Sequence, residues 1–317
     1  MLETEKTYLS IVIPHYNSVK LLKKLLSTIP DRKEVQIIIV DDNSTENLEE
    51  LEEIVQSRRE QILFLKNESG KNSAGRCRNI GMAKAEGKWL LFADADDYFT
   101  PDFYDTLLPY FESDYDIVWF VPTSWNLDTR EVSNRHLRYQ KLVENFLTEQ
   151  SQTAEVKLRY MEESPCSKIV RRSLVTEQNI QFDEIMVAND IMFSVRCAYA
   201  AERVAASEKV IYCMTKQQGT LTTAVNKEKF YVRFGVFLDK YHFLKERLSS
   251  KEWHMLDLLG RPYIKLAKNY GLDKKEIRSV YFTMLKKGIR IDVSRKWTPG
   301  YVIKKIGTRF SEGLKRK

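Results

Sequence analysis

The feature that most constrains the fold is an alternation of short apolar segments with helical segments over residues 1–125. The apolar segments are rich in β-branched residues and have the length of buried strands. They are residues 8–13, 35–40, 62–65, 89–93 and 116–121. Leucine and isoleucine recur at helical spacing over 21–29 and 48–54, with Ser44 or Thr45 as a candidate N-cap, and 74–86 forms a helical pattern that Gly87 ends. The alternation predicts an α/β fold with a mostly parallel sheet covered on both faces.

The remainder of the chain becomes progressively helical. Lys168–Gln178 and Asn189–Ala201 have helical patterns and Val210–Cys213 is typical of a strand. Residues 226–317 are helical in pattern, with helices expected over 230–248, 253–269, 274–287 and 300–317. We therefore expect one domain over 1–225, made of halves 1–125 and 126–225, followed by a C-terminal helical region over 226–317.

Charge and composition exclude several classes of protein. The chain has 51 basic and 44 acidic residues, but residues 261–317 alone hold 17 basic and 4 acidic ones, so the rest is net acidic. An argument for a polyanionic partner therefore concerns only that basic region. The polar N-terminus predicts no secretory signal, and no apolar run is long enough to span a membrane. Four scattered cysteines without zinc-site spacing then favour a reduced, cytoplasmic protein.

Polar and acidic residues follow three of the expected strands. Residues 14–17, 41–43 and 94–97 each stand where a strand ends. Ligands of open α/β sheets bind beyond the carboxyl ends of the strands. We therefore expect these three segments to form the functional site.

The residue types at this rim suggest a nucleotide and a cation. Asp94 and Asp96, with Asp97 beside them, repel one another unless a divalent cation such as Mg²⁺ or Mn²⁺ neutralises them, although acids at a strand end also cap turns. Asp42 suits a hydrogen bond from a base or ribose, or an Asx turn. Of Arg76 and Arg78, one is expected to reach a diphosphate or hold the acidic rim, unless both are ordinary surface arginines.

Four motifs in register resemble those of the family 2 glycosyltransferases of GT-A fold. They are Ile11-Val-Ile-Pro-His-Tyr-Asn17, Val40-Asp-Asp-Asn-Ser-Thr45, Gly75-Arg-Cys-Arg-Asn-Ile-Gly81 and Leu91-Phe-Ala-Asp-Ala-Asp-Asp97. A weaker similarity continues to residue 222, and the last helical part is hardly covered. The most similar members are the bacterial enzymes that build capsular polysaccharide, exopolysaccharide or O-antigen.

The resemblance implies a role for each matched position. It places the nucleotide sugar, with a UDP-sugar favoured, against Pro14, Tyr16, Asn17, Asp42, Arg76, Asn79, Asp94 and Lys168. It makes Asp96, with Asp94, the ligand of Mn²⁺ or Mg²⁺. Residues 216–222 resemble the family's basic loop near the donor phosphates. The acceptor implied is a saccharide or a lipid-linked saccharide of surface polysaccharide synthesis.

The catalytic base that the resemblance implies is Asp190. The family has a Glu-Asp pair at the start of a helix, and here the pair is Asn189-Asp190, so the usual Glu is missing. An inverting transfer needs one carboxylate to take the proton of the acceptor hydroxyl. We expect the helix N-terminus to keep Asp190 ionised, and the alternative reading of Asp190 is a simple helix cap.

Two other functions use the same features. A nucleotidyltransferase also needs acids, a metal and a nucleotide, but usually carries a glycine-rich, lysine-containing loop that residues 14–17 lack. A nucleic-acid-binding protein is suggested by the basic region alone, and we expect no nucleic acid as partner. Residues 300–317 are instead basic and amphipathic, which predicts either contact with the anionic inner face of the cell membrane or a helix docked on the protein.

Overall fold

The structure is a computed structural model that describes residues 6–217 and 226–291. The chain divides into two compact units. The first contains the described residues of Met1–Ala224 together with Gly235–Leu256, and the second contains those of Val225–Phe234 and Asp257–Lys317. The amphipathic segment predicted over 300–317 lies outside the described residues.

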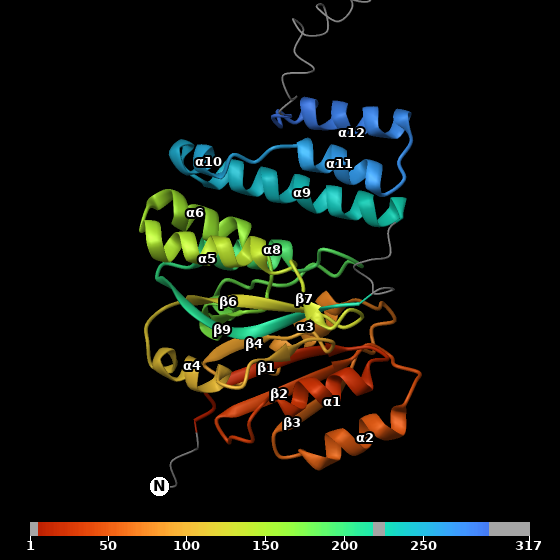
Figure 1. The fold of residues 1–317 in the computed structure, drawn as a ribbon, viewed down its shortest axis with the longest axis vertical. Helices are drawn as coiled ribbons and strands as arrows, with labels where there is room; N and C mark the ends of the chain where they lie inside the picture. Colours follow the sequence, from red (N-terminus) through yellow and green to blue (C-terminus); the bar gives the residue numbers. More distant parts are fainter. Residues whose placement is uncertain (1–5, 218–225, 292–317) are drawn as a thin grey trace, which may run out of the picture. The chain divides into compact units, whose positions relative to one another are not determined.

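The described part of the first unit is built around a nine-stranded sheet (Figure 1). Its strands are β1 (Leu9–His15), β2 (Val35–Asp41), β3 (Ile62–Lys66), β4 (Trp89–Phe92), β5 (Tyr98–Phe99), β6 (Ile117–Asn126), β7 (Glu131–Val132), β8 (Lys168–Arg171) and β9 (Val204–Lys216). The order is β3-β2-β1-β4-β8-β6-β9-β5, with β7 paired to β6. The pairs β3–β2, β2–β1, β1–β4 and β6–β9 are parallel, whereas β8 runs antiparallel to β4 and β6. The predicted mostly parallel α/β sheet is confirmed.

Helices cover both faces of the sheet because alternate strand residues are apolar on both faces. The bounds of the helices in this unit are α1 (Val19–Ser27), α2 (Leu48–Ser57), α3 (Ala74–Met82), α4 (Phe103–Phe111), α5 (Leu137–Glu149), α6 (Gln152–Met161), α7 (Arg172–Glu177), α8 (Ile191–Ala200) and α10 (Ser250–Leu256). Ile11 of β1 shares a core cluster with Leu22 of α1 and Leu107 of α4. Its neighbour Val12 faces the other way, against Gly81 of α3.

Phe92, at the end of β4, anchors α8 on the α3 face. Its ring meets those of Phe182 and Phe193 edge to face, and the latter two rings stack with centroids 3.8 Å apart. Phe193 belongs to the first turn of α8. The start of α8 is thereby fixed next to the end of β4.

One predicted helix is partly wrong. Lys168–Gln178 was expected to be helical throughout, but its first four residues form β8, and only Arg172–Glu177 is helical. Ile169 and Val170 are fully buried and pair with both β4 and β6. A strand buried between two others gains both backbone partners and apolar burial, which outweighs a local helical pattern.

Two predicted helix ends are also wrong. Neither Ser44 nor Thr45 caps α2, because its N-cap is Asn47 and the Ser44 hydroxyl instead donates to Asp41. Helix α3 ends at Met82 rather than at residue 86. Gly87 is needed for another reason, since a Cβ there would lie 2.5 Å from the backbone nitrogen of Ser10.

The described part of the second unit is helical, but the single helix expected over 253–269 is wrong, because the chain leaves the helical conformation between Leu256 and Arg261 and forms two helices, α10 and α11 (Arg261–Asn269). The second unit contains the first residues of α9 (Lys227–Arg247), α11 and α12 (Lys274–Lys286). Asp273 and Glu276 form a capping box at the start of α12. Among the described residues, no helix combines the length and the apolar character needed to cross a bilayer.

Candidate active site

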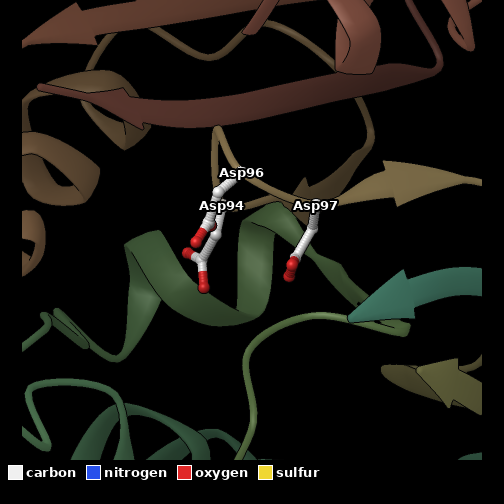
Figure 2. Close-up of side chains that lie close together, drawn as sticks. All are labelled: Asp94, Asp96 and Asp97. Carbon is white, nitrogen blue, oxygen red and sulfur yellow. The ribbon is translucent and has the colours of Figure 1, made fainter. Parts of the chain in front are cut away.

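Three carboxylates gather immediately after β4. Asp94, Asp96 and Asp97 each offer an oxygen, and these oxygens lie within 4.8 Å of one another (Figure 2). In Figure 2 the carboxylates of Asp94 and Asp96 lie side by side, and that of Asp97 is set apart. Burial, together with the Asp94 carboxylate, raises the pKa of Asp96. This mutual repulsion is what a bound cation relieves.

Asp97 differs from its two neighbours because protein groups already satisfy it. It is 2% exposed and accepts hydrogen bonds from the Tyr212 hydroxyl at 2.7 Å and the Thr215 backbone nitrogen at 2.6 Å. Tyr212 in turn accepts a hydrogen bond at 2.9 Å from the backbone nitrogen of Asp94. Asp97 therefore ties the acidic turn to β9 and leaves Asp94 and Asp96 as the accessible pair.

Arg78 of α3 connects the acidic turn to the segment before α8. Its guanidinium forms an ion pair with Asp94 and donates to the Asn189 side-chain oxygen at 2.8 Å. The Arg78 side chain is only 6% exposed, and its Nε makes no hydrogen bond in the described part of the chain. Of the two arginines considered from the sequence, Arg78 is thus the one that holds the acidic rim.

Asp190 stands at the N-cap position of α8 but does not act as a cap. Its side chain makes no capping hydrogen bond. Burial raises the pKa of the Asp190 carboxyl, and the positive charge of Arg78 only partly offsets this. This direction is opposite to the one that a helix N-terminus alone would give, and the expectation that Asp190 is ionised near neutral pH stays a prediction.

The loops after β1 and β2 form the rest of the rim. Asn17 accepts hydrogen bonds on its side-chain oxygen from the backbone nitrogens of Thr45 at 2.8 Å and Glu46 at 3.2 Å. Asp42 is buried and accepts a 2.6 Å hydrogen bond from Asn67. Tyr16 is 53% exposed.

Pro14 lies in the same strand end, as part of β1, where it pairs with Val40 and is half-buried. The structure thus brings the first-strand residues and Asp42 together, as the strand order requires.

Two of the residues predicted to contact the donor, Arg76 and Asn79, have protein partners in the structure, and their contact with the donor stays a prediction. Arg76 forms a bidentate pair with Glu184, at 3.0 Å to each oxygen. Asn79 bonds the backbone of Phe182 as donor at 3.0 Å and as acceptor at 2.8 Å. Both side chains hold the segment before α8 against α3.

Lys168 is the first residue of β8, and its side chain is buried. It is 1% exposed and pairs with buried Glu162 at 2.8 Å. Trp119 donates to the same carboxylate at 3.1 Å. Glu162 thus holds the Lys168 ammonium group inside the protein, and the contact of Lys168 with the donor stays a prediction.

Sequence reasoning missed two residues near the acids. Arg135 donates to the backbone oxygen of Thr215, and its charge interacts with all three carboxylates of the acidic turn. Asn67, after β3, holds Asp42. Neither residue belongs to one of the four motifs. Asn67 follows the strand predicted over 62–65, and this position could have marked it as a residue of the rim.

Comparison with known proteins identifies the fold. The chain resembles the solved structure of Staphylococcus aureus TarS residues 1–349 in complex with UDP-GlcNAc, with a TM-score of 0.63, 20% identity, and coverage of 88% of this chain and 80% of that one. It also resembles the mannosyltransferase PcManGT from Pyrobaculum calidifontis in complex with GDP-Man and Mn²⁺, with a TM-score of 0.55, 14% identity, and coverage of 95% and 83%. The architecture is that of the GT-A glycosyltransferases.

Sequence comparison places the chain within this class. Residues 10–178 match the model of "Glycosyl transferase family 2", and the chain belongs to that family. The poly(ribitol-phosphate) beta-N-acetylglucosaminyltransferase TarS of Staphylococcus aureus (strain Mu50 / ATCC 700699) is 26% identical over 235 residues, which are 70% of this chain. The match spans only 38% of the length of that relative.

Proposed function

We propose that this protein transfers a sugar, with inversion, from a nucleotide-sugar donor to a saccharide or lipid-linked acceptor in surface polysaccharide synthesis. The observation that carries the proposal is that Arg78 links two segments: it pairs with Asp94 of the acidic turn and donates to Asn189, the residue before Asp190. The acidic turn suits the diphosphate end of a donor, and Asp190 suits the acceptor hydroxyl. Family membership favours this reaction over the nucleotidyl transfer that acids and a nucleotide alone allow.

The donor lies, in this proposal, along the rim formed by β1, β2 and β4. Exposed Tyr16 suits stacking against a base, and Asn17 and Asp42 suit polar contacts to the nucleoside. The relative TarS is described in complex with UDP-GlcNAc, which makes a UDP-sugar the first donor to test.

The arrangement of Asp94 and Asp96 suits a divalent cation. They present oxygen atoms from one turn, with the pKa of Asp96 raised by burial and by Asp94, and oxygen donors suit Mg²⁺ and Mn²⁺. When bound, the cation would stabilise the negative charge that develops on the departing diphosphate. Asp97 already accepts hydrogen bonds from Tyr212 and Thr215, and the proposal does not need it as a ligand.

Asp190 is the proposed base. A carboxylate whose pKa is raised by burial accepts a proton more readily than an exposed one, which suits removal of the acceptor hydroxyl proton. The neighbouring Asn189 accepts the hydrogen bond from Arg78, and the Asp190 side chain makes no capping hydrogen bond to α8.

The acceptor belongs to the class that family relatives use. TarS is named as acting on poly(ribitol-phosphate), and a cytoplasmic protein at the inner membrane face has access to lipid-linked and polymeric precursors. We propose this location together with the acceptor.

The test is a screen of UDP-GlcNAc, UDP-glucose and GDP-mannose for thermal stabilisation and for nucleotide release, each with and without Mn²⁺. The proposal expects at least one donor to stabilise the protein, and to do so more strongly with Mn²⁺. Asp96→Asn is expected to remove that effect. Asp102→Asn is the control, because Asp102 is an exposed acid beyond β5, at the start of α4, whose side chain makes no capping hydrogen bond. Absence of stabilisation and release with every donor would overturn the proposal.

A further inference from the structure

A buried histidine joins the ends of β1 and β2. His15 and Asp41 face each other in the β1–β2 register, and their side chains are 0% and 4% exposed. The His15 Nδ1 lies 2.9 Å from an Asp41 carboxylate oxygen. The backbone nitrogen of Ser18 donates to His15 Nε2 at 3.3 Å, so Nε2 carries no proton and Nδ1–H is the donor to Asp41.

The hydrogen bonds continue from this pair into both loops. The Ser44 hydroxyl donates to Asp41 at 2.6 Å and accepts from the backbone nitrogen of Asn17 at 2.9 Å. The backbone nitrogen of Ser44 also donates to Asp41, at 3.0 Å. Burial alone raises the pKa of Asp41, but the hydrogen bonds from His15 and Ser44 reverse this and lower it overall. The buried carboxylate is therefore the charged centre of the connection.

The two loops hold a conformation that an isolated chain rarely adopts. Asn17 has a φ of 45° and Asn43 a φ of 64°, both in the left-handed region. The Asn43 amide donates to the backbone oxygen of Asn67 at 3.0 Å. Residues in such conformations persist where the surroundings fix them, and they gather at ligand sites. Here the bond that holds Asn17 leads back through Ser44 to Asp41, and the bond that holds Asn43 leads to Asn67.

We infer that His15 is a positioning residue for the donor nucleotide. By holding Asp41 and Ser18, it keeps the loops after β1 and β2 in the conformation that presents Asn17 and Asp42 to the nucleoside. The backbone of His15 itself accepts a hydrogen bond from the backbone nitrogen of Asp42 at 2.8 Å. The inference rests on the proposed function, since it assigns the nucleoside to these loops.

A second serine provides a matched control at the opposite end of the same strand pair. The Ser10 hydroxyl donates to Gln36 at 2.6 Å and accepts from the backbone nitrogen of Gly87 at 2.9 Å. Ser44 also donates at 2.6 Å and accepts at 2.9 Å, but at the rim, and its acceptor is a carboxylate rather than an amide. Ser10→Ala and Ser44→Ala therefore each remove one donated and one accepted hydrogen bond, and only the second removes them from the loops.

The experiment measures UDP affinity by calorimetry in the presence of Mn²⁺, and stability by urea unfolding. Both are measured for the wild-type protein and for Ser44→Ala, His15→Phe and Ser10→Ala. A binding-competent loop population reduced to one tenth raises the apparent Kd about tenfold. We expect roughly that increase for Ser44→Ala and His15→Phe, and a change of less than about twofold for Ser10→Ala. With the donor found by the screen, KM should rise in the same two variants while kcat at saturating donor keeps most of its value.

The outcomes separate the two proposals. Wild-type protein that binds no nucleotide overturns the proposed function, and this inference with it. Wild-type binding with equal Kd values in Ser44→Ala and Ser10→Ala overturns the inference alone and leaves His15 a structural residue. Ser44→Ala creates little cavity, so this comparison holds even where His15→Phe fails to fold.

Discussion

Asp94 and Asn189, far apart in the sequence, accept hydrogen bonds from the same buried guanidinium, that of Arg78. This shared donor fixes the distance between the acidic turn and the segment that leads into α8, where Asp190 is the N-cap residue. In the resemblance, a glutamate occupies the position of Asn189. Here Arg78 meets a neutral amide at that position, and so its charge is directed mainly at Asp94.

Replacing Arg78 by lysine is expected to separate these two elements. Lysine lacks the planar fork and keeps at most one of the two bonds. The free energy of unfolding should fall by about 2 kcal/mol, in the range of buried hydrogen bonds to charged groups, and turnover by roughly a hundredfold through misplacement. Urea unfolding and a transfer assay check both values. Arg203→Lys, which changes an exposed pair with Asp114, should leave both nearly unchanged.

Loss of Asp96 should abolish transfer without unfolding the protein. Asp96→Ala removes one of the two accessible acids, and relief of repulsion with Asp94 leaves the fold at least as stable. Activity is expected to fall to background, and EDTA should do the same to the wild-type protein. Activity that survives either treatment would show that these acids hold no essential cation.

Asp190→Asn distinguishes a catalytic base from a helix cap, because the two roles predict opposite changes in turnover and in stability. Removal of a general base costs about 10² to 10⁴ in kcat, while donor affinity stays near the wild-type value. The raised pKa of Asp190 means that the folded state holds its proton more tightly than the unfolded chain does. The charged form is therefore destabilising once the pH exceeds the folded pKa.

At neutral pH, Asp190→Asn should consequently raise the melting temperature while it removes activity. Below the unfolded pKa of an aspartate, near pH 3.9, this difference in stability should vanish. A cap would give the reverse: lower stability and retained turnover. Thermal melts at two pH values, with single-turnover assays, decide between them.

The basic segment 300–317 is expected to bind anionic membranes. Each lysine or arginine near such a surface contributes about 1 kcal/mol. The full chain should sediment with phosphatidylserine vesicles at low salt and be released at high salt, whereas a chain ending near Trp297 should remain in the supernatant. Equal behaviour of both chains would assign these residues to an ordinary helix.

The sequence predicts the first half of the sheet well because the physical signal is local. Strands β1 and β2 are buried on both faces, so nearly every residue is apolar and the strand stands out without alternation. The acidic rim follows from the same pattern, since parallel strands end at one edge.

The errors arise where long-range contacts decide. Lys168 resembles a surface lysine, and only the buried partner Glu162 explains its place in the sheet. Ser44 resembles an N-cap until His15 and Asp41 are brought beside it by strand pairing. Arg135 lies close to the acids through the return of β9, which no local pattern foretells.

The position of β8 bears on how the chain is made. Strand β8 lies between β4 and β6 in the sheet, and β9 lies on the other side of β6. Both β8 and β9 are synthesised well after β6. While a ribosome is still making the intervening helices, β4 and β6 lack β8, the strand that pairs with both, although β1 to β4 can already pair. Such late, non-local pairing slows folding and leaves strand edges open to association with other chains. A nascent chain stalled before residue 168 should therefore depend on chaperones, and one extended past residue 216 should not.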